Sequence, residues 1–123
     1  MTRFKSQGFG KTFKNARKGF RLVLKSEMNL RVHVVIAMLV LLFAYLLDFS
    51  SLEYCILLLA ISTVIVAEML NTAIEFTLDA IFHNRYSRMV GMAKDISAGA
   101  VMFASFISVF VGLILFGKHI LGF

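Results

Sequence analysis

Residues 54–79 read YCILLLAISTVIVAEMLNTAIEFTLD. The first fourteen of them, 54–67, carry no charge, and such an apolar stretch is typical of a membrane-spanning helix. Glu68 and Glu75 follow, and a carboxylate in or near hydrocarbon is costly enough to indicate a function. Because positions 68, 71, 75 and 79 advance by three or four residues, a helix would place two Glu, one Asn and one Asp on the same face.

The composition of the chain points to a membrane protein. Its 123 residues are 59% hydrophobic and include no Pro and no Trp, which is too apolar for a soluble domain of this size. Further apolar runs lie before and after residues 54–67 in the sequence. A helix needs roughly 20 residues to cross about 30 Å of hydrocarbon. We therefore expect one all-α domain over residues 1–123, with membrane spans at about 31–48, 53–75 and 95–117.

The distribution of charge predicts the orientation of these spans. Nine of the thirteen Lys and Arg residues precede residue 32, and three lie between residues 76 and 95. The connection at 48–53 carries only Asp48 and Glu53. By the positive-inside rule, the N-terminus and a 76–95 loop should be cytoplasmic, in the plasma membrane of the cell. The long basic leader indicates that the apolar run at about 31–48, the first along the chain, is retained as a span and is not a cleavable signal peptide.

The basic leader has a helical pattern of its own. One stripe is apolar and includes Phe9, Phe13 and Phe20, whereas another is cationic and includes Lys14 and Lys18. This pattern is typical of a helix that lies in the membrane surface with its cations toward anionic headgroups. We expect such an amphipathic surface helix at about 5–28.

The third apolar run carries small residues at every fourth position: Ala100, Ala104, Ser108 and Gly112. Such stripes allow helix backbones to approach closely in lipid. Three helices of this length enclose little interior, so we also expect the chain to form an oligomer. Cys55 is the only cysteine, which excludes a disulfide framework and a thiolate metal site.

Other polar residues should reach the cytoplasmic interface of the membrane, where the 68–79 face is also expected to end. Carboxylates are hard oxygen donors of the kind that Mg²⁺ takes together with substrate phosphates. The candidates are Glu27, Glu75, Asp79 and Asp95. Lys94 and Arg31 could neutralise phosphate charge. Glu68, which lies within the hydrocarbon, suits a general base that acts on a hydroxyl group.

Together these groups meet the needs of phosphoryl transfer: a metal, a cationic clamp, and a base beside the acceptor. Because the base lies in lipid, the acceptor would be a lipid alcohol. Two other classes stay open on spacing alone. A transporter or channel subunit could use an intramembrane Glu to line a pore, and an assembly or regulatory protein could use it to pair with Lys.

Several short motifs follow one another along the chain. Residues 68–75 read EMLNTAIE, and residues 93–101 read AKDISAGAV. Before them come Phe13-x-Asn15-Ala16-x-x-Gly19 and Glu27-x-Asn29-x-Arg31-x-His33. In this order and spacing, the motifs resemble those of the small prokaryotic diacylglycerol kinase family over almost the whole chain. The form around His33 resembles the Gram-positive undecaprenol kinase branch of that family.

The resemblance implies a homotrimeric membrane kinase that uses ATP and Mg²⁺ to phosphorylate undecaprenol, with diacylglycerol as the alternative acceptor. It implies that Glu68 accepts the proton of the lipid hydroxyl, with Asn71 helping to position the site, and that Glu27 and Glu75 hold Mg²⁺. The implied nucleotide site consists of Asn15, Glu27, Arg85, Tyr86, Ser87, Lys94 and Asp95. Glu68 and Arg31 would contact the lipid substrate. The expected partners are ATP, a lipid alcohol, the membrane and further copies of the chain, with no nucleic acid.

Overall fold

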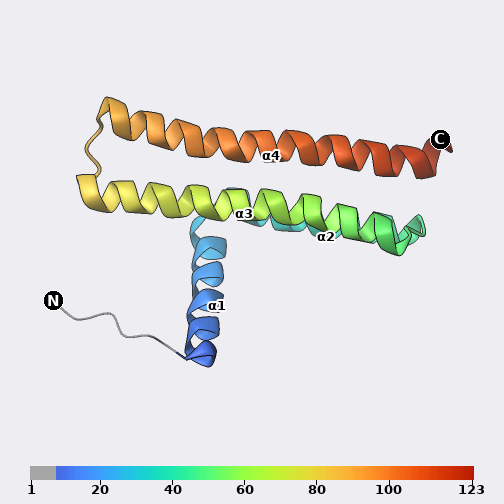
Figure 1. The fold of residues 1–123 in the computed structure, drawn as a ribbon, viewed down its shortest axis with the longest axis horizontal. Helices are drawn as coiled ribbons and strands as arrows, with labels where there is room; N and C mark the ends of the chain where they lie inside the picture. The colour runs from blue at the N-terminus through green and yellow to red at the C-terminus, as the bar shows by residue number, and fades with distance from the viewer. Residues whose placement is uncertain (1–7) are drawn as a thin grey trace.

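The computed structural model describes residues 8–123, and it folds them into helices throughout. The helices are α1 (Phe9–Ser26), α2 (Met28–Leu46), α3 (Ser51–Phe82) and α4 (Arg88–Leu121). In Figure 1, α2, α3 and α4 run alongside one another and α1 lies across their direction. Helix α3 contacts both α2 and α4. The all-α class is therefore confirmed.

Helices α2, α3 and α4 are each long and apolar enough to cross a membrane. With 19 residues, α2 is about 28 Å long at 1.5 Å per residue, which matches the thickness of the hydrocarbon. With 32 and 34 residues, α3 and α4 are about 48 Å and 51 Å long. These two helices therefore continue well beyond a single bilayer crossing.

The expectation of a loop over residues 76–95 is wrong, because most of this segment is helical. Helix α3 continues to Phe82 and α4 already begins at Arg88, so the connection comprises only residues 83–87. Charged residues indicate where a chain leaves the hydrocarbon. A helix can continue past that point when its charged side chains pair with a neighbouring helix, as Asp79 of α3 does with Lys94 of α4. The second expected span is thus continued at its C-terminal end, and the third at its N-terminal end, by two further helical turns each.

Local backbone chemistry sets the ends of this connection. His83 adopts a left-handed conformation with φ of 50°, and its N–H donates to the carbonyl oxygen of Asp79 to close α3. The hydroxyl oxygen of Ser87 accepts a hydrogen bond of 3.2 Å from the backbone N–H of Val90, which is an N-cap for α4.

Helix α1 lies within the segment 5–28 for which a surface helix is expected, and it ends at Ser26; residues 5–7 lie outside the described residues. It has no buried residue, and its Phe9 and Phe13 side chains are 87% and 62% exposed. Glu27, in extended conformation, separates α1 from α2. This single non-helical residue allows the chain to turn sharply, so that α1 leaves the direction of the other helices (Figure 1).

The seam between α3 and α4 is formed by small and polar side chains. Ala104 and Ser97 of α4 are buried, and the Ser108 hydroxyl donates a hydrogen bond of 2.9 Å to the carbonyl oxygen of Ala60. In lipid, where apolar burial does not drive helices together, close packing and such hydrogen bonds do. Part of the small-residue stripe expected in the third apolar run therefore serves packing within the chain.

The main apolar cluster of the described residues lies at the end of the helices where the connection between α2 and α3 is found. It contains Ala44, Phe49, Leu57 and Leu115, which come from α2, the connection after it, α3 and α4. The ring of Phe49 also stacks on the ring of His119 with their centroids 4.6 Å apart. The C-terminal end of α4 is thereby packed against the connection between α2 and α3.

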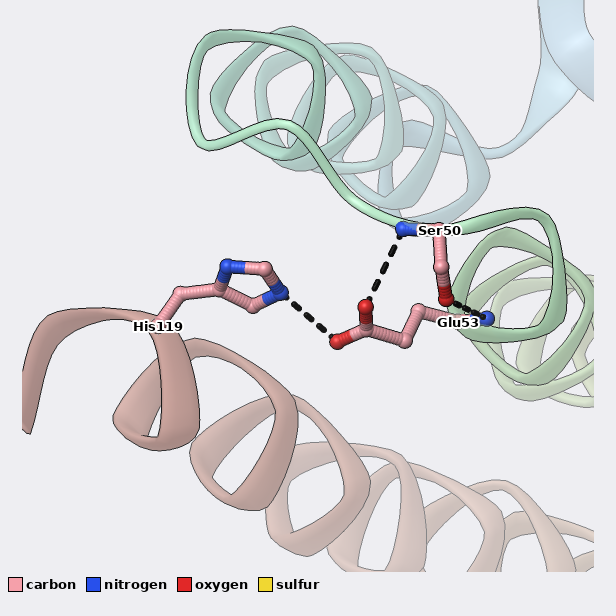
Figure 2. Close-up of polar contacts among 3 residues, drawn as sticks. All are labelled: Ser50, Glu53 and His119. Carbon is pink, nitrogen blue, oxygen red and sulfur yellow. Dashed lines mark hydrogen bonds and ion pairs between the residues drawn. The ribbon is translucent and has the colours of Figure 1, made fainter. Parts of the chain in front are cut away.

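Glu53 connects the same elements through polar contacts (Figure 2). Its Oε2 lies 2.7 Å from Nε2 of His119, and its Oε1 accepts a hydrogen bond of 3.0 Å from the backbone N–H of Ser50. The hydroxyl of Ser50 in turn accepts a hydrogen bond of 3.2 Å from the backbone N–H of Glu53. The reciprocal contacts form a capping box at the start of α3.

Replacing Glu53 should lower the thermal stability of the protein in two steps. Glu53→Gln keeps a side chain that serves in a capping box but removes the charge opposite His119. Glu53→Ala removes both contacts and should lower the unfolding midpoint further. Circular dichroism of the detergent-solubilised protein measures both midpoints. Asp48→Asn, which removes one exposed charge from the same connection, should change little; an equal loss there would show that the Glu53–His119 contact does not stabilise the fold.

Candidate active site

Glu68 begins the polar face of α3 and is buried, with 3% of its surface exposed. Glu27, His33 and Glu75 are close enough to act on it electrostatically. Glu27 reaches this position because it occupies the joint between α1 and α2, and α1 also contacts α3. The expected meeting of Glu27 with the 68–79 face thus appears in the structure.

Glu27 and Glu75 are therefore carboxylates within electrostatic range of the Glu68 carboxylate. Like charges repel, so neighbouring carboxylates favour a bound cation. Within residues 8–123, no three His, Cys, Asp or Glu side chains converge closely enough to hold a metal ion together. The donor set therefore fits Mg²⁺ only in its usual manner, with one or two protein carboxylates and the other ligands from phosphate and water.

Asn71 and Glu75 are linked to α4 by a chain of hydrogen bonds. The Ser97 hydroxyl donates to Oδ1 of Asn71 over 2.7 Å, and Nδ2 of Asn71 donates to Oε1 of Glu75 over 3.3 Å. Thr72, also buried, donates its hydroxyl proton to the carbonyl oxygen of Glu68 over 3.1 Å. The polar face predicted from the spacing of these residues is therefore present, and α4 covers part of it.

Asp79 and Lys94 form an ion pair between α3 and α4, with Oδ1 and Nζ 2.8 Å apart. Both side chains are more than one-third exposed, so this pair lies where the site opens to solvent. The sequence suggested Asp79 as an oxygen donor for a metal, but the structure gives it a cation of the protein as its partner. Its contact fixes the position of the Lys94 ammonium group.

The other predicted site residues lie on exposed surface around this array. Asn15 is on α1, Arg31 is in the first turn of α2, and Asp95 follows Lys94 on α4. Arg85, Tyr86 and Ser87 form the connection between α3 and α4, where Ser87 caps α4. Ser87 precedes Lys94 by seven residues, which is about 10 Å along the helix. The connection therefore lies at the open end of the site, away from Glu68.

Sequence reasoning gave no individual role to two buried residues of the site. Ser97 and Thr72 are 6% and 1% exposed, and both make hydrogen bonds to the polar face. Ser97 follows Lys94 by three residues, and this spacing in the sequence indicates that the two side chains share one face of a helix. Thr72 bonds only to the backbone of its own helix, which no spacing indicates.

Comparison with known proteins agrees with this arrangement. The family model of prokaryotic diacylglycerol kinase matches residues 14–116. Undecaprenol kinase of Bacillus subtilis (strain 168) is 36% identical over 108 residues, which cover 88% of this chain and 87% of that protein.

Two diacylglycerol kinases are also similar. That of Synechocystis sp. is 32% identical over 101 residues, covering 82% of this chain and 58% of that protein. That of Escherichia coli (strain K12) is 31% identical over 102 residues, covering 83% of each. The match to the family model includes parts of all four helices and the whole polar array. The chain therefore belongs to the prokaryotic diacylglycerol kinase family, and it is a lipid kinase embedded in the membrane.

Proposed function

We propose that this kinase transfers the γ-phosphoryl group of ATP to the hydroxyl group of undecaprenol at the cytoplasmic face of the plasma membrane. The observation that carries the proposal is the polar array that begins at buried Glu68 and ends at half-exposed Lys94. A hydroxyl group that meets Glu68 must arrive from the lipid. A nucleotide can reach Lys94 from water, so the array joins the two phases.

In the proposed reaction, Glu68 takes the hydroxyl proton as the lipid oxygen attacks the γ-phosphorus. A new bond forms between this oxygen and phosphorus, the bond from phosphorus to the bridging oxygen breaks, and ADP leaves with the electron pair. Lys94 stabilises the charge on the phosphate oxygens. Glu27 and Glu75 would hold Mg²⁺, which supplies further charge neutralisation to the phosphates when it is bound.

The surroundings of Glu68 support an apolar acceptor. A groove of about 400 Å³ lies between α2, α3 and α4 and is lined almost entirely by aliphatic side chains. It begins at His33, which acts electrostatically on Glu68, and extends to Phe116 near the other end of α4. Part of a long hydrocarbon chain would lie in this groove while its hydroxyl end meets Glu68.

Undecaprenol is the preferred acceptor because the undecaprenol kinase of B. subtilis shares more identity with this chain than the diacylglycerol kinases compared above, at 36% against 31–32%. Diacylglycerol is the second candidate, favoured by the family model, and its phosphorylation would give phosphatidic acid.

The exposed side chains of the helices support a proposal for how the protein lies in the membrane. Phe9 and Phe13 on α1 are exposed and would insert between lipids while the basic residues of α1 meet anionic headgroups. The concentration of Lys and Arg before residue 32 and between residues 76 and 95 supports a cytoplasmic N-terminus and α3–α4 connection. We further propose a homotrimer, with Asn15, Arg85, Tyr86 and Asp95 at the nucleotide. The broad apolar surfaces left exposed on α2, α3 and α4 would be covered by neighbouring copies and by lipid.

The purified protein, supplied with γ-labelled ATP and Mg²⁺, should transfer label to undecaprenol faster than to diacylglycerol. Both acceptors are presented at equal mole fraction in the same mixed micelles, and the labelled lipid is measured after extraction. Faster labelling of diacylglycerol would reverse the choice of acceptor. Labelling of neither lipid would contradict the proposed reaction.

Glu68→Gln should lower the turnover rate roughly 10²–10⁴-fold, the usual contribution of a general base. The amide keeps the size of the side chain but does not accept the proton. The matched control is Glu53→Gln, which makes the same change in the same helix at the opposite end and should retain turnover below its unfolding midpoint. Near-normal turnover of an intact Glu68→Gln protein would exclude Glu68 as the base.

Asp79→Asn should raise the KM for ATP by about two- to fivefold, the range expected from loss of an exposed ion pair, with kcat nearly unchanged. Lys94→Met should have a larger effect on both constants, because it removes the group that meets phosphate. In a Lys94→Met background, Asp79→Asn should add nothing further. Lys118→Met at the other end of α4 is the control. Additive effects of the two changes would mean that Asp79 does not act through Lys94.

A further inference from the structure

The most specific feature that the proposed reaction leaves unused is the buried hydroxyl of Ser97. It lies on α4, 2.7 Å from Oδ1 of Asn71 and 3.0 Å from the carbonyl oxygen of Lys94. A hydroxyl group carries one proton, so it donates to only one of these oxygens at a time. Which oxygen receives the proton decides the orientation of the Asn71 amide.

The two ends of the Asn71 amide differ in chemistry, since Oδ1 only accepts hydrogen bonds and Nδ2 only donates them. When Ser97 donates to Oδ1, Nδ2 faces Glu75 and donates to its Oε1 over 3.3 Å. In the flipped orientation, Oδ1 would face the carboxylate of Glu75, and two acceptors would repel one another. The Ser97 proton and the Glu75 carboxylate therefore select the same orientation of Asn71.

We infer that Ser97 is a positioning residue, which orients the Asn71 amide and through it holds the Glu75 carboxylate in the geometry needed for the metal and nucleotide. This inference rests on the proposed function, in which Glu75 is a metal ligand. Ser97 itself does not contact the reacting groups. Its effect passes through two hydrogen bonds, one from Ser97 on α4 to Asn71 on α3 and one from Asn71 to Glu75 within α3, so the relative position of these helices controls a ligand on α3.

The chain offers a matched control for the structural part of this role. Ser108 also lies on α4, and its hydroxyl also donates across the seam, over 2.9 Å to the carbonyl oxygen of Ala60. It follows Ser97 by eleven residues, about 16 Å along the helix. Ser97→Ala and Ser108→Ala therefore each remove one hydrogen bond between α3 and α4, but only the first should disturb Glu75.

The test measures divalent-metal affinity by two methods. Mg²⁺ is titrated in the kinase assay at saturating ATP and lipid, and Mn²⁺ binding in the presence of a non-hydrolysable ATP analogue is measured by electron paramagnetic resonance. Ser97→Ala should weaken both by about two- to tenfold, the range for loss of one hydrogen bond. Ser97→Thr, which keeps the hydroxyl, should restore most of the affinity. Ser108→Ala should leave both titrations unchanged even if it lowers the unfolding midpoint.

Two further variants separate this inference from the proposed function. Glu75→Gln should weaken both titrations more than Ser97→Ala does, and in an Asn71→Ala background Ser97→Ala should have no additional effect. If Glu75→Gln leaves the titrations unchanged, the metal role of Glu75 fails and the inference fails with it. If Glu75→Gln weakens them but Ser97→Ala does not, or if Ser97→Ala and Ser108→Ala act alike, only the positioning role of Ser97 is overturned.

Discussion

Helices α3 and α4 are antiparallel and each about 50 Å long, so they remain in contact beyond the thickness of a bilayer. The contacts between them change in kind along the seam. Within the span, small side chains pack closely and Ser108 bonds to the backbone of α3. Further along, Ser97 bonds to Asn71, and beyond that Lys94 pairs with Asp79. An exposed ion pair contributes little by itself, so the buried part of the seam must hold the exposed part in register.

This constraint also bears on the proposed site of the chemistry. The side chains that join α3 to α4 belong to the same face as Glu68 and Glu75, so in the proposed reaction packing and phosphoryl transfer share one set of residues. Helix α2 is shorter and begins beside Glu68, where Glu27 turns the chain into it. The buried carboxylate therefore lies near the level at which α2 begins, while the proposed nucleotide end of the array projects beyond it.

Two glutamates of α3 have opposite surroundings, which supports the proposal that one is structural and the other functional. Glu53 accepts a backbone hydrogen bond from Ser50 and contacts His119, so its charge is offset by donors (Figure 2). Glu68 has two other carboxylates, Glu27 and Glu75, among its electrostatic neighbours. A fold gains nothing from gathering like charges, whereas a site that takes up protons and cations requires them.

Hydrophobic run length and helical spacing in the sequence were sufficient to predict three spans and the polar face from Glu68 to Asp79, whereas the class of chemistry came from the resemblance of several motifs to a known family. These properties are local, since each depends on a single helix. The pairing of Asp79 with Lys94 and the link from Ser97 to Asn71 depend on the register between helices. That register is decided by tertiary packing, because one helix pattern does not specify which turn of its neighbour it will face.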